Sequence, residues 1–230
     1  MGRKSFRLQM VLLVILTLLP GCGRSGGAWI SLNEADSLSV RSKDTTPYSG
    51  DIRISFLGDC TLGGQESRRR SGLGFEKRIE QNGYDFPFRN LKKLTASDDL
   101  TIANLEGVLS DRKLKKEPKK YNFIGPSDYA RILTSGSIEC VTLANNHSHD
   151  YGEEGYSDTK AALEAEGIAW FGTESPVIWQ NDEGLMIGFL GVNYSLTGDR
   201  YKRFREQAQA LKEIGCAAVI TVMHAGTEYS

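Results

Sequence analysis

Residues able to do chemistry gather in four short clusters of this 230-residue chain. The clusters are Gly58-Asp59-Cys60, Asn104-Leu105-Glu106-Gly107, Asn145-Asn146-His147 and His224-Ala225-Gly226-Thr227-Glu228. Together they offer carboxylates, amides and imidazoles, which are the side chains that hold a metal able to activate water. Oxygen and nitrogen donors in one site favour zinc, manganese, iron or nickel over calcium. Hydrolysis of a phosphoryl or an acyl group is the chemistry that such a centre would serve.

Each cluster directly follows a short apolar run, which predicts that it stands at the end of a buried strand. Such runs cover residues 52–57, 100–103, 140–143, 168–171, 186–192 and 217–223. The last is nearly continuous in apolar residues, which is typical of a strand buried on both faces. Helical patterns lie between the runs, at 75–81, 88–96, 128–134, 154–166 and 203–214, and the last two stop at Gly167 and Gly215. This alternation of strand and helix predicts an α/β sandwich.

The carboxyl ends of strands are where ligands bind in sheets of this kind, so we expect the four clusters to meet at one edge. Asn104 and Glu106 are alternate residues of an extended segment and face the same side. Each cluster alone also has a structural explanation, with Asp59 as a turn residue, Glu106 as a solvated strand end and His147 as a core histidine. The coincidence of four strand ends favours a site.

Several other residues could do chemistry but are better explained as structural. Cys60 could bind a metal, although packing is the simpler role, and Cys140 and Cys216 are predicted core residues at strand starts. His149 is expected at the surface or behind the site. Residues 111–120 hold six basic side chains and are most simply a solvated loop, with a patch that contacts a polyanion as the alternative.

The overall charge argues against one class of partner. With 28 basic and 29 acidic residues the formal charge is −1, so the chain has no global field that would gather nucleic acid. We therefore expect no nucleic-acid partner.

The first 22 residues have the pattern of an export signal: basic residues at the start and an apolar run over 8–19, too short to span a bilayer. Leu19-Pro20-Gly21-Cys22 resembles a bacterial lipobox, in which Cys22 would receive a diacylglyceryl group. An ordinary cleaved signal is the alternative. We expect a signal peptide over 1–22, a flexible linker over 23–50, a folded domain over 51–230, and a protein lipid-anchored on the extracytoplasmic face of the cell membrane.

The motifs together resemble the CapA, or poly-γ-glutamate capsule biosynthesis, family. The resemblance rests on Phe56-Leu57-Gly58-Asp59, Ala103-Asn104-Leu105-Glu106-Gly107, the segment from Leu143 to Gly152, and His224-Ala225-Gly226-Thr227-Glu228-Tyr229. It implies a calcineurin-like metallophosphoesterase fold, an αββα sandwich. The family usually has a hydrophobic residue at the position of His149 and a tryptophan at the position of Ala225.

The resemblance also implies a metal centre and a set of partners. It assigns a divalent metal (manganese, zinc or iron) to six residues: Asp59, Asn104, Glu106, Asn146, His147 and His224. Asp59, Glu106 and His147 would be catalytic, and Glu106 could act on the substrate instead of the metal. The implied function is metal-dependent hydrolysis of an anionic envelope polymer or its phosphorylated precursor. The alternative is a non-catalytic accessory subunit that binds a polymer such as poly-γ-glutamate beside membrane synthase subunits.

Members of this family usually continue to a Gly-x-His-Pro-His loop and closing strands, whereas this sequence stops at Ser230. We therefore expect the sandwich to be incomplete at its C-terminus, the chain to be less stable than a complete homologue, and its metal affinity to be weak. An inactive truncated remnant is a third possibility.

The lipid anchor gives a direct prediction. Cys22→Ala removes the thiol that would carry the lipid, so we expect the protein to move from the membrane fraction to the soluble fraction when cells are lysed and separated by centrifugation. A variant that stays as firmly membrane-bound as the wild type would contradict a lipid on Cys22.

Overall fold

The computed structural model describes residues 27–32, 34–35, 48, 50–69, 71–72, 74–194 and 197–226. The predicted signal peptide, with Cys22, and the end of the last motif (227–230) lie outside the described residues. Within these ranges, no helix combines the length and the apolar character that crossing a bilayer requires.

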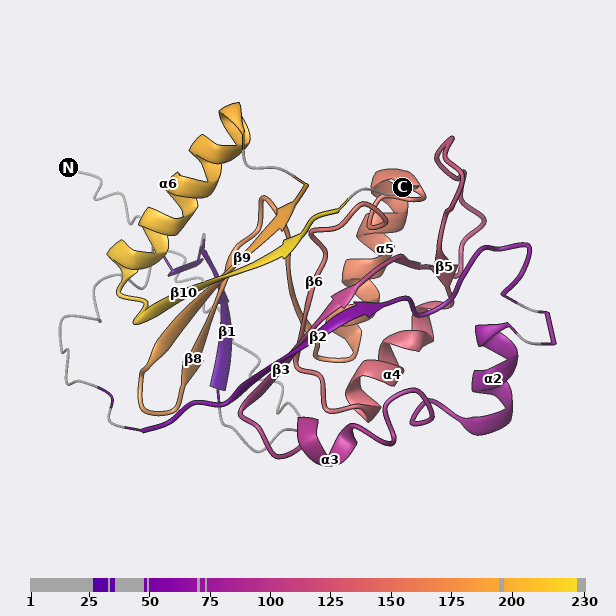
Figure 1. Cartoon of the computed structure of the whole chain (residues 1–230), viewed down its shortest axis with the longest axis horizontal. Coiled ribbons are helices and arrows are strands. Elements are labelled where there is room, and N and C mark those ends of the chain that lie inside the picture. The colour runs from indigo at the N-terminus through magenta and orange to yellow at the C-terminus, as the bar shows by residue number, and fades with distance from the viewer. Residues whose placement is uncertain are drawn as a thin grey trace, which may run out of the picture.

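Two four-stranded sheets form the centre of the described structure (Figure 1). One has the order β2-β3-β6-β7 and is wholly parallel, with strands β2 (Ile54–Cys60), β3 (Leu100–Leu105), β6 (Cys140–Thr142) and β7 (Ala169–Phe171). The other has the order β1-β8-β9-β10, with strands β1 (Gly27–Ser31), β8 (Val177–Asn181), β9 (Met186–Asn193) and β10 (Ala218–His224). In it only β9 and β10 run parallel, and β1, β8 and β9 pair antiparallel. A small parallel pair joins β4 (Val108–Leu109) to β5 (Ile124–Gly125).

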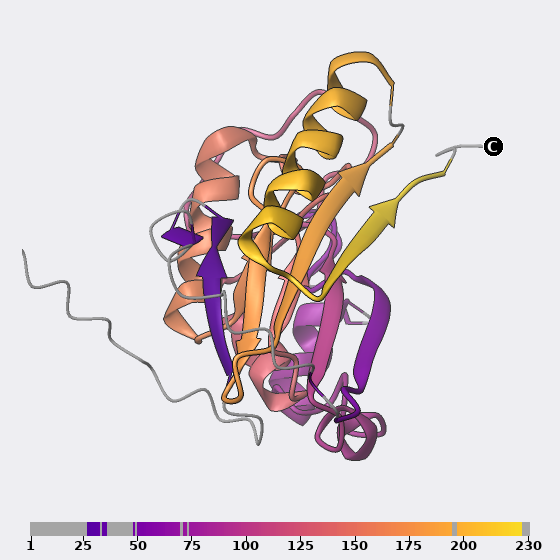
Figure 2. The ribbon, with the colours of Figure 1, turned by 90° about the vertical axis from the view of Figure 1, so that its left-hand side faces the viewer.

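Helices cover the outer face of each sheet. On the side of the β2-β3-β6-β7 sheet lie α2 (Phe75–Asn82), α3 (Lys92–Thr95), the 3-10 turn η1 (Ser127–Tyr129), α4 (Ala130–Ser135) and α5 (Gly152–Ala165). The other sheet carries α6 (Gly198–Ile214) on its outer face, as Figure 2 shows from the side. The layers are therefore helix, sheet, sheet and helix, which confirms the predicted αββα sandwich.

Three clusters of buried side chains fill the three spaces between these layers. Val141 and Leu163 belong to the cluster between the parallel sheet and its helices. Phe171 and Phe189 meet between the two sheets, with ring centroids 6.0 Å apart. Leu211 of α6 packs in the third cluster, against the outer face of the second sheet. Because neighbouring residues of a strand point to opposite faces, β6 contributes to two of these cores at once.

The helix ends follow the signals in the sequence. Gly167 and Gly215 lie just beyond α5 and α6 with φ of 70° and 105°. This is the left-handed region, which glycine enters without the steric cost of a Cβ atom. The predicted helix over 88–96 is shorter than expected, because only Lys92–Thr95 is helical and turns precede it.

Part of the predicted flexible linker is a strand. Residues 27–31 form β1, which pairs antiparallel with β8 in register from Gly27 with Asn181 to Ser31 with Val177. Trp29 packs at the core between the sheets, and its ring lies 5.8 Å from that of Phe189. Neither β1 nor its partner β8 was predicted from the sequence. In β1, the apolar trio Ala28-Trp29-Ile30 is too short to show a period.

The prediction that 217–223 is buried on both faces is wrong. Strand β10 stands at the edge of its sheet (Figure 2), and among the described residues it pairs with β9 alone. Val219 reaches the core under α6, and Ile220 and Val222 face the other sheet. Met223, near the end of this edge strand, is 52% exposed.

A carboxylate at the opposite end of the sheets gives a pH prediction. The side chain of Glu139 accepts a 2.8 Å hydrogen bond from the backbone N–H of Thr101. Burial raises the pKa of Glu139 to about 7, and the charge of Asp98 acts in the same direction. The folded state thus binds a proton that the unfolded chain releases near pH 4 to 5. The stability that this proton contributes is present below the unfolded pKa and is lost as the pH rises through about 7.

Glu139→Gln is neutral at every pH and keeps an oxygen for Thr101. We expect it to change stability little at pH 4.5 and to stabilise the protein by about 1 to 3 kcal/mol at pH 8, measured by thermal unfolding at both values. Glu183→Gln, at an exposed glutamate, is the control. A Glu139→Gln effect of equal size at the two pH values would contradict the raised pKa.

Candidate metal centre

The four predicted clusters meet across the carboxyl ends of both sheets. Asp59 lies at the end of β2, Asn104 lies in β3 with Glu106 just after it, and the loop after β6 carries His147. His224 ends β10 and so comes from the other sheet. The strands that deliver these residues are held by packing between the sheets, because Ile54, Ile102 and Cys140 from one sheet share a core with Ile220 and Val222 of β10.

Asp59, Glu106 and His224 form the centre of the site. Each offers one ligand atom, and these three atoms all lie within 4.8 Å of one another. The Nδ1 atom of His224 is 3.4 Å from Oδ1 of Asp59, and its Nε2 atom is 3.8 Å from Oε1 of Glu106. Two carboxylates and an imidazole are a donor set that suits manganese, zinc or iron. The residues present therefore fit the predicted kind of metal.

Amide side chains bracket this trio. Asn104 donates from Nδ2 to Oδ1 of Asp59 over 2.7 Å, and the same nitrogen lies 3.1 Å from Nδ1 of His224. On the other side, Oδ1 of Asn146 is 2.9 Å from Nε2 of His224. Asn145 donates to Oδ1 of Asn104 and to the Leu105 carbonyl, both over 2.9 Å, so it fixes the Asn104 amide. The side-chain amide of Asn104 would have to flip to turn its oxygen toward a metal.

His147 is buried at the back of the site and is held in one orientation. Its Nδ1 atom lies 2.8 Å from Oδ2 of the fully buried Asp150, and its Nε2 atom is 3.8 Å from Oε1 of Glu106. The ring of Phe123 stacks on the imidazole with centroids 4.3 Å apart. The tautomer that donates its Nδ1–H to Asp150 leaves the lone pair of Nε2 facing the centre, as in histidines that bind metals.

Lys119 belongs to the same network and was missed by the sequence reasoning. Its ammonium group forms an ion pair with Asp150 and donates a 2.7 Å hydrogen bond to the backbone carbonyl of Asn146. It stands in the segment 111–120 that was predicted to be a solvated loop. The sequence gives no signal for it, because nothing separates this lysine from the five other basic residues of the segment. Its charge compensates a carboxylate that has no access to solvent.

The electrostatics of the trio favour a bound cation. Burial raises the pKa of Glu106 and the negative charge of Asp59 raises it further, whereas His147, His224 and a hydrogen bond from Thr61 lower it. The Glu106 side chain is 14% exposed but that of Asp59 is 54% exposed, so the centre opens to solvent on the Asp59 side. A cation would relieve the repulsion between the two carboxylates, and a substrate could approach from that open side.

Cys60 and His149 lie within the motifs but outside the metal centre, as expected from the sequence. Cys60 packs against the core under the helices, and burial, followed by the charge of Asp59, raises the pKa of its thiol to about 11. His149 has a half-exposed side chain that pairs with Glu153 and stacks on Tyr156 with centroids 4.3 Å apart. The structure thus brings together all six residues predicted for the metal and leaves these two aside. That the six bind a metal stays a prediction.

Comparisons with known proteins agree with this arrangement. The PGA biosynthesis protein CapA of Bacillus subtilis (strain 168) is 25% identical over 153 residues, which are 63% of this chain and 38% of that protein. The capsule biosynthesis protein CapA of Bacillus anthracis is 25% identical over 149 residues, 61% of this chain and 34% of that protein. The aligned parts thus span little more than a third of the curated relatives.

A family model described as "Bacterial capsule synthesis protein PGA_cap" matches residues 53–230. The match includes every strand end that contributes to the centre and confirms the resemblance found in the motifs. Because it covers more than half of the sequence, the chain belongs to the bacterial capsule synthesis protein family PGA_cap.

Proposed function

We propose that the chain acts in the synthesis of an anionic envelope polymer such as poly-γ-glutamate, as a metal-dependent hydrolase of the polymer or of its phosphorylated precursor. The observation that carries the proposal is the trio Asp59, Glu106 and His224, whose ligand atoms lie within 4.8 Å of one another at an open edge of the sandwich. The printed names of the two relatives, which concern capsule and PGA biosynthesis, support the polymer as the context.

In this proposal, the residues of the centre hold manganese, zinc or iron. Asp59, Glu106, His147 and His224 are the charged and imidazole ligands, and Asn104 and Asn146 complete the set. A divalent metal bound there would act as a Lewis acid and lower the pKa of a coordinated water.

The chain's own residues supply position and proton transfer. Asp150 holds the Nδ1–H proton of His147, so that Nε2 stays directed at the centre. In the alternative where Glu106 acts on the substrate instead of the metal, it would take a proton from the attacking water, because its Oε1 atom lies at the centre, 3.8 Å from both His147 and His224. Asp59, on the exposed side, is the first ligand that an entering substrate would meet.

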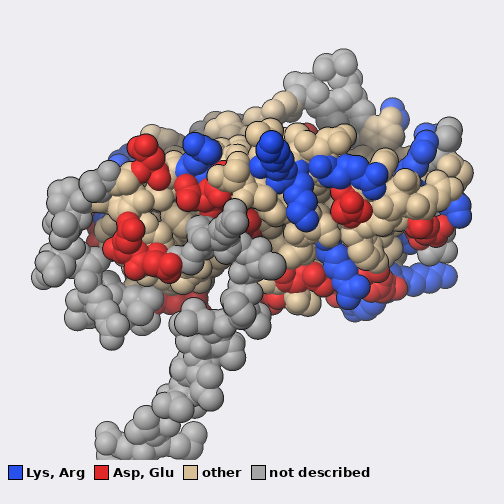
Figure 3. Space-filling view, turned by 90° about the horizontal axis from the view of Figure 1, so that it is seen from below, with Lys and Arg blue, Asp and Glu red and all other residues tan. Residues whose placement is uncertain are grey.

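A non-catalytic role as a polymer-binding partner of membrane synthase subunits is the second candidate. One feature favours it: Lys116 and Lys120 line a cavity of about 280 Å³ with Glu66, Asn122 and Tyr151. The two ammonium groups outnumber the one carboxylate, so this cavity needs no metal to attract an anion. Elsewhere the charges are mixed. Figure 3 shows Asp and Glu predominating on the left of one face and Lys and Arg, with some acidic groups among them, toward the right, so the visible part of this face carries both signs of charge.

We also propose that Cys22 carries a lipid on the extracytoplasmic side of the membrane. The position of β1 limits how far the folded domain can lie from the membrane, because Gly27 already belongs to the β1-β8-β9-β10 sheet. Five residues reach at most roughly 18 Å when fully extended. A lipid on Cys22 would therefore hold β1, and with it the second sheet, close to the bilayer surface.

The enzymatic proposal predicts metal-dependent turnover. With added Mn²⁺ we expect slow hydrolysis of bis-p-nitrophenyl phosphate and its loss by at least roughly a hundredfold in Asp59→Ala and His147→Ala, because each removes a ligand. His149→Ala is the matched control, since it deletes an imidazole two positions away that is exposed and faces Tyr156. Binding of poly-γ-glutamate that is unaffected by chelator, together with no turnover, would favour the accessory role over the enzyme.

The orientation of His147 gives a second prediction. Asp150→Asn keeps the shape of the side chain but removes the charge that holds the Nδ1–H proton, so we expect Mn²⁺ affinity to fall roughly tenfold to a hundredfold. Titration calorimetry measures the affinity, and ¹⁵N NMR of the imidazole shows whether the proton leaves Nδ1. Unchanged affinity and an unchanged tautomer would show that Asp150 does not position His147.

A further inference from the structure

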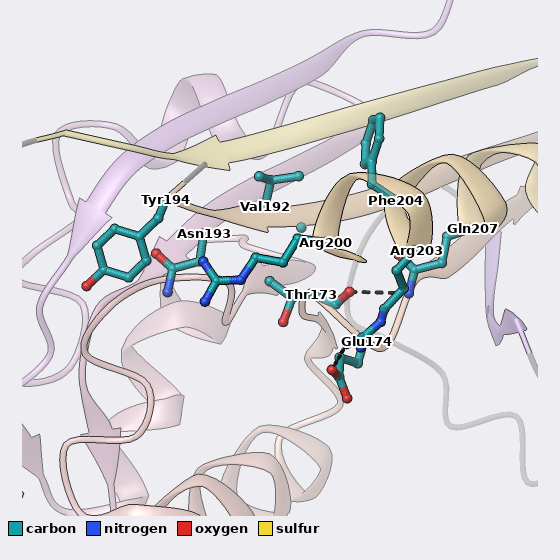
Figure 4. A pocket seen from close by; sticks show the side chains of 10 residues that line it. Thr173, Glu174, Val192, Asn193, Tyr194, Arg200, Arg203, Phe204 and Gln207 are labelled. Carbon is teal, nitrogen blue, oxygen red and sulfur yellow. Dashed lines mark hydrogen bonds and ion pairs between the residues drawn. The ribbon is translucent and has the colours of Figure 1, made fainter. Parts of the chain in front are cut away.

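A second cavity lies on the same edge of the sandwich, outside the metal centre (Figure 4). It has a volume of about 280 Å³ and lies between the end of β9, the start of α6 and the segment after β7. Its polar lining comes mainly from Asn193, Arg200, Arg203 and Gln207. None of these residues was singled out by the sequence, because they share no motif.

Some polar groups of this cavity are already satisfied and two are not. Arg203 forms an ion pair with Glu174, and Gln207 donates a 3.2 Å hydrogen bond to the Thr173 carbonyl. Among the described residues, Arg200 forms no ion pair, and the buried Oδ1 atom of Asn193 accepts no hydrogen bond. A guanidinium group and a carbonyl oxygen therefore remain for a ligand. A buried acceptor without a donor is costly, so an N–H group of a ligand that enters the cavity would gain by binding this oxygen.

The β9–β10 pair links the lining of the cavity to the metal centre. Asn193 is the register partner of His224, so the two side chains point to the same face of the sheet from neighbouring strands. The backbone N–H of Tyr194 also donates a 2.9 Å hydrogen bond to the His224 carbonyl. An elongated ligand that reaches His224 can thus extend over Asn193 toward Arg200.

The size and charge of the cavity define the ligand. Small-molecule sites usually have volumes of roughly 300 to 1,000 Å³, so a cavity at the lower limit accepts one residue of a longer chain. Arg203 is neutralised by Glu174, which leaves the charge of Arg200 for a carboxylate, the group that a guanidinium binds in a bidentate manner. The Asn193 oxygen requires an N–H donor. A carboxylate and an amide N–H occur together in each repeat of an acidic polyamide, whereas the backbone of a phosphodiester polymer has no N–H.

We propose that this cavity is a subsite for one carboxylate-bearing residue of an acidic polyamide chain, with Arg200 binding the carboxylate and Asn193 accepting from the amide. The choice of polymer rests on the proposed function. The binding itself requires no metal, so it can be separated from hydrolysis.

Binding of a γ-linked glutamate oligomer to the metal-free chain, measured by titration calorimetry in the presence of chelator, tests the proposal. We expect Arg200→Gln to weaken binding by at least roughly tenfold and Arg200→Lys to weaken it less. Lysine keeps the positive charge but lacks the two parallel N–H donors with which arginine binds a carboxylate. Arg205→Gln is the matched control, since Arg205 lies on the same helix, is exposed, and contacts the Tyr201 ring. Asn193→Leu should also weaken binding without lowering the unfolding temperature, because its oxygen has no partner to lose.

The outcomes separate this inference from the proposed function. Equal affinities for wild type, Arg200→Gln and Arg200→Lys, with the oligomer still bound, would overturn the subsite and leave the polymer context intact. Binding of polyphosphate but not of the glutamate oligomer would overturn the polyamide as ligand and, with it, poly-γ-glutamate as the proposed polymer. No binding of either anion by the wild type would overturn the subsite, whereas metal-dependent phosphodiester turnover would then still support the hydrolase.

Discussion

The packing of the two sheets against each other is the constraint on which the rest of the structure depends. Phe171 and Phe189 meet in the core between them, and Ile220 and Val222 bring β10 against the parallel sheet. His224, which ends β10, is thereby held within 3.4 Å of Asp59. Without this core the carboxylates and the imidazole would lie on separate sheets, because no hydrogen-bonded ladder joins β10 to β2 or β3 in the described structure. An apolar interface thus assembles a polar site.

Behind the metal centre, buried polar side chains form hydrogen bonds and ion pairs with one another in place of the water that they lost on folding. Asp150 is fully buried and is satisfied by Lys119, by His147 and by the backbone N–H of Phe123 at 2.6 Å. These contacts hold the carboxylate in place against Nδ1 of His147 and so orient the imidazole. The network connects the segment from Lys119 to Phe123 with the loop after β6, so it also holds the loop that presents Asn146 and His147.

The open edge formed by the carboxyl ends of the strands contains two kinds of chemistry side by side. The centre around Asp59, Glu106 and His224 gathers negative charge that a cation would balance, whereas the cavity at Arg200 gathers positive charge that an anion would balance. Asn193 and His224, paired in register, form the boundary between them. With a divalent cation bound at the centre, a long anionic ligand would meet positive charge at both places, which is the complementarity that a polymer could use.

By itself, the sequence determined which residues end the strands. Apolar runs and terminal glycines are local signals, and they predicted six strands and five helical regions. The six residues now found together at the centre were assigned by the resemblance of the motifs to a known family. Only the tertiary structure decided which strand ends meet, because the contact between Asn104 and His224 joins residues 120 positions apart. It also placed β1 in a sheet, left β10 at an edge, and selected Lys119, Asn193 and Arg200 from residues of the same types. Burial and pairing depend on neighbours that are distant in the sequence, and no local pattern records them.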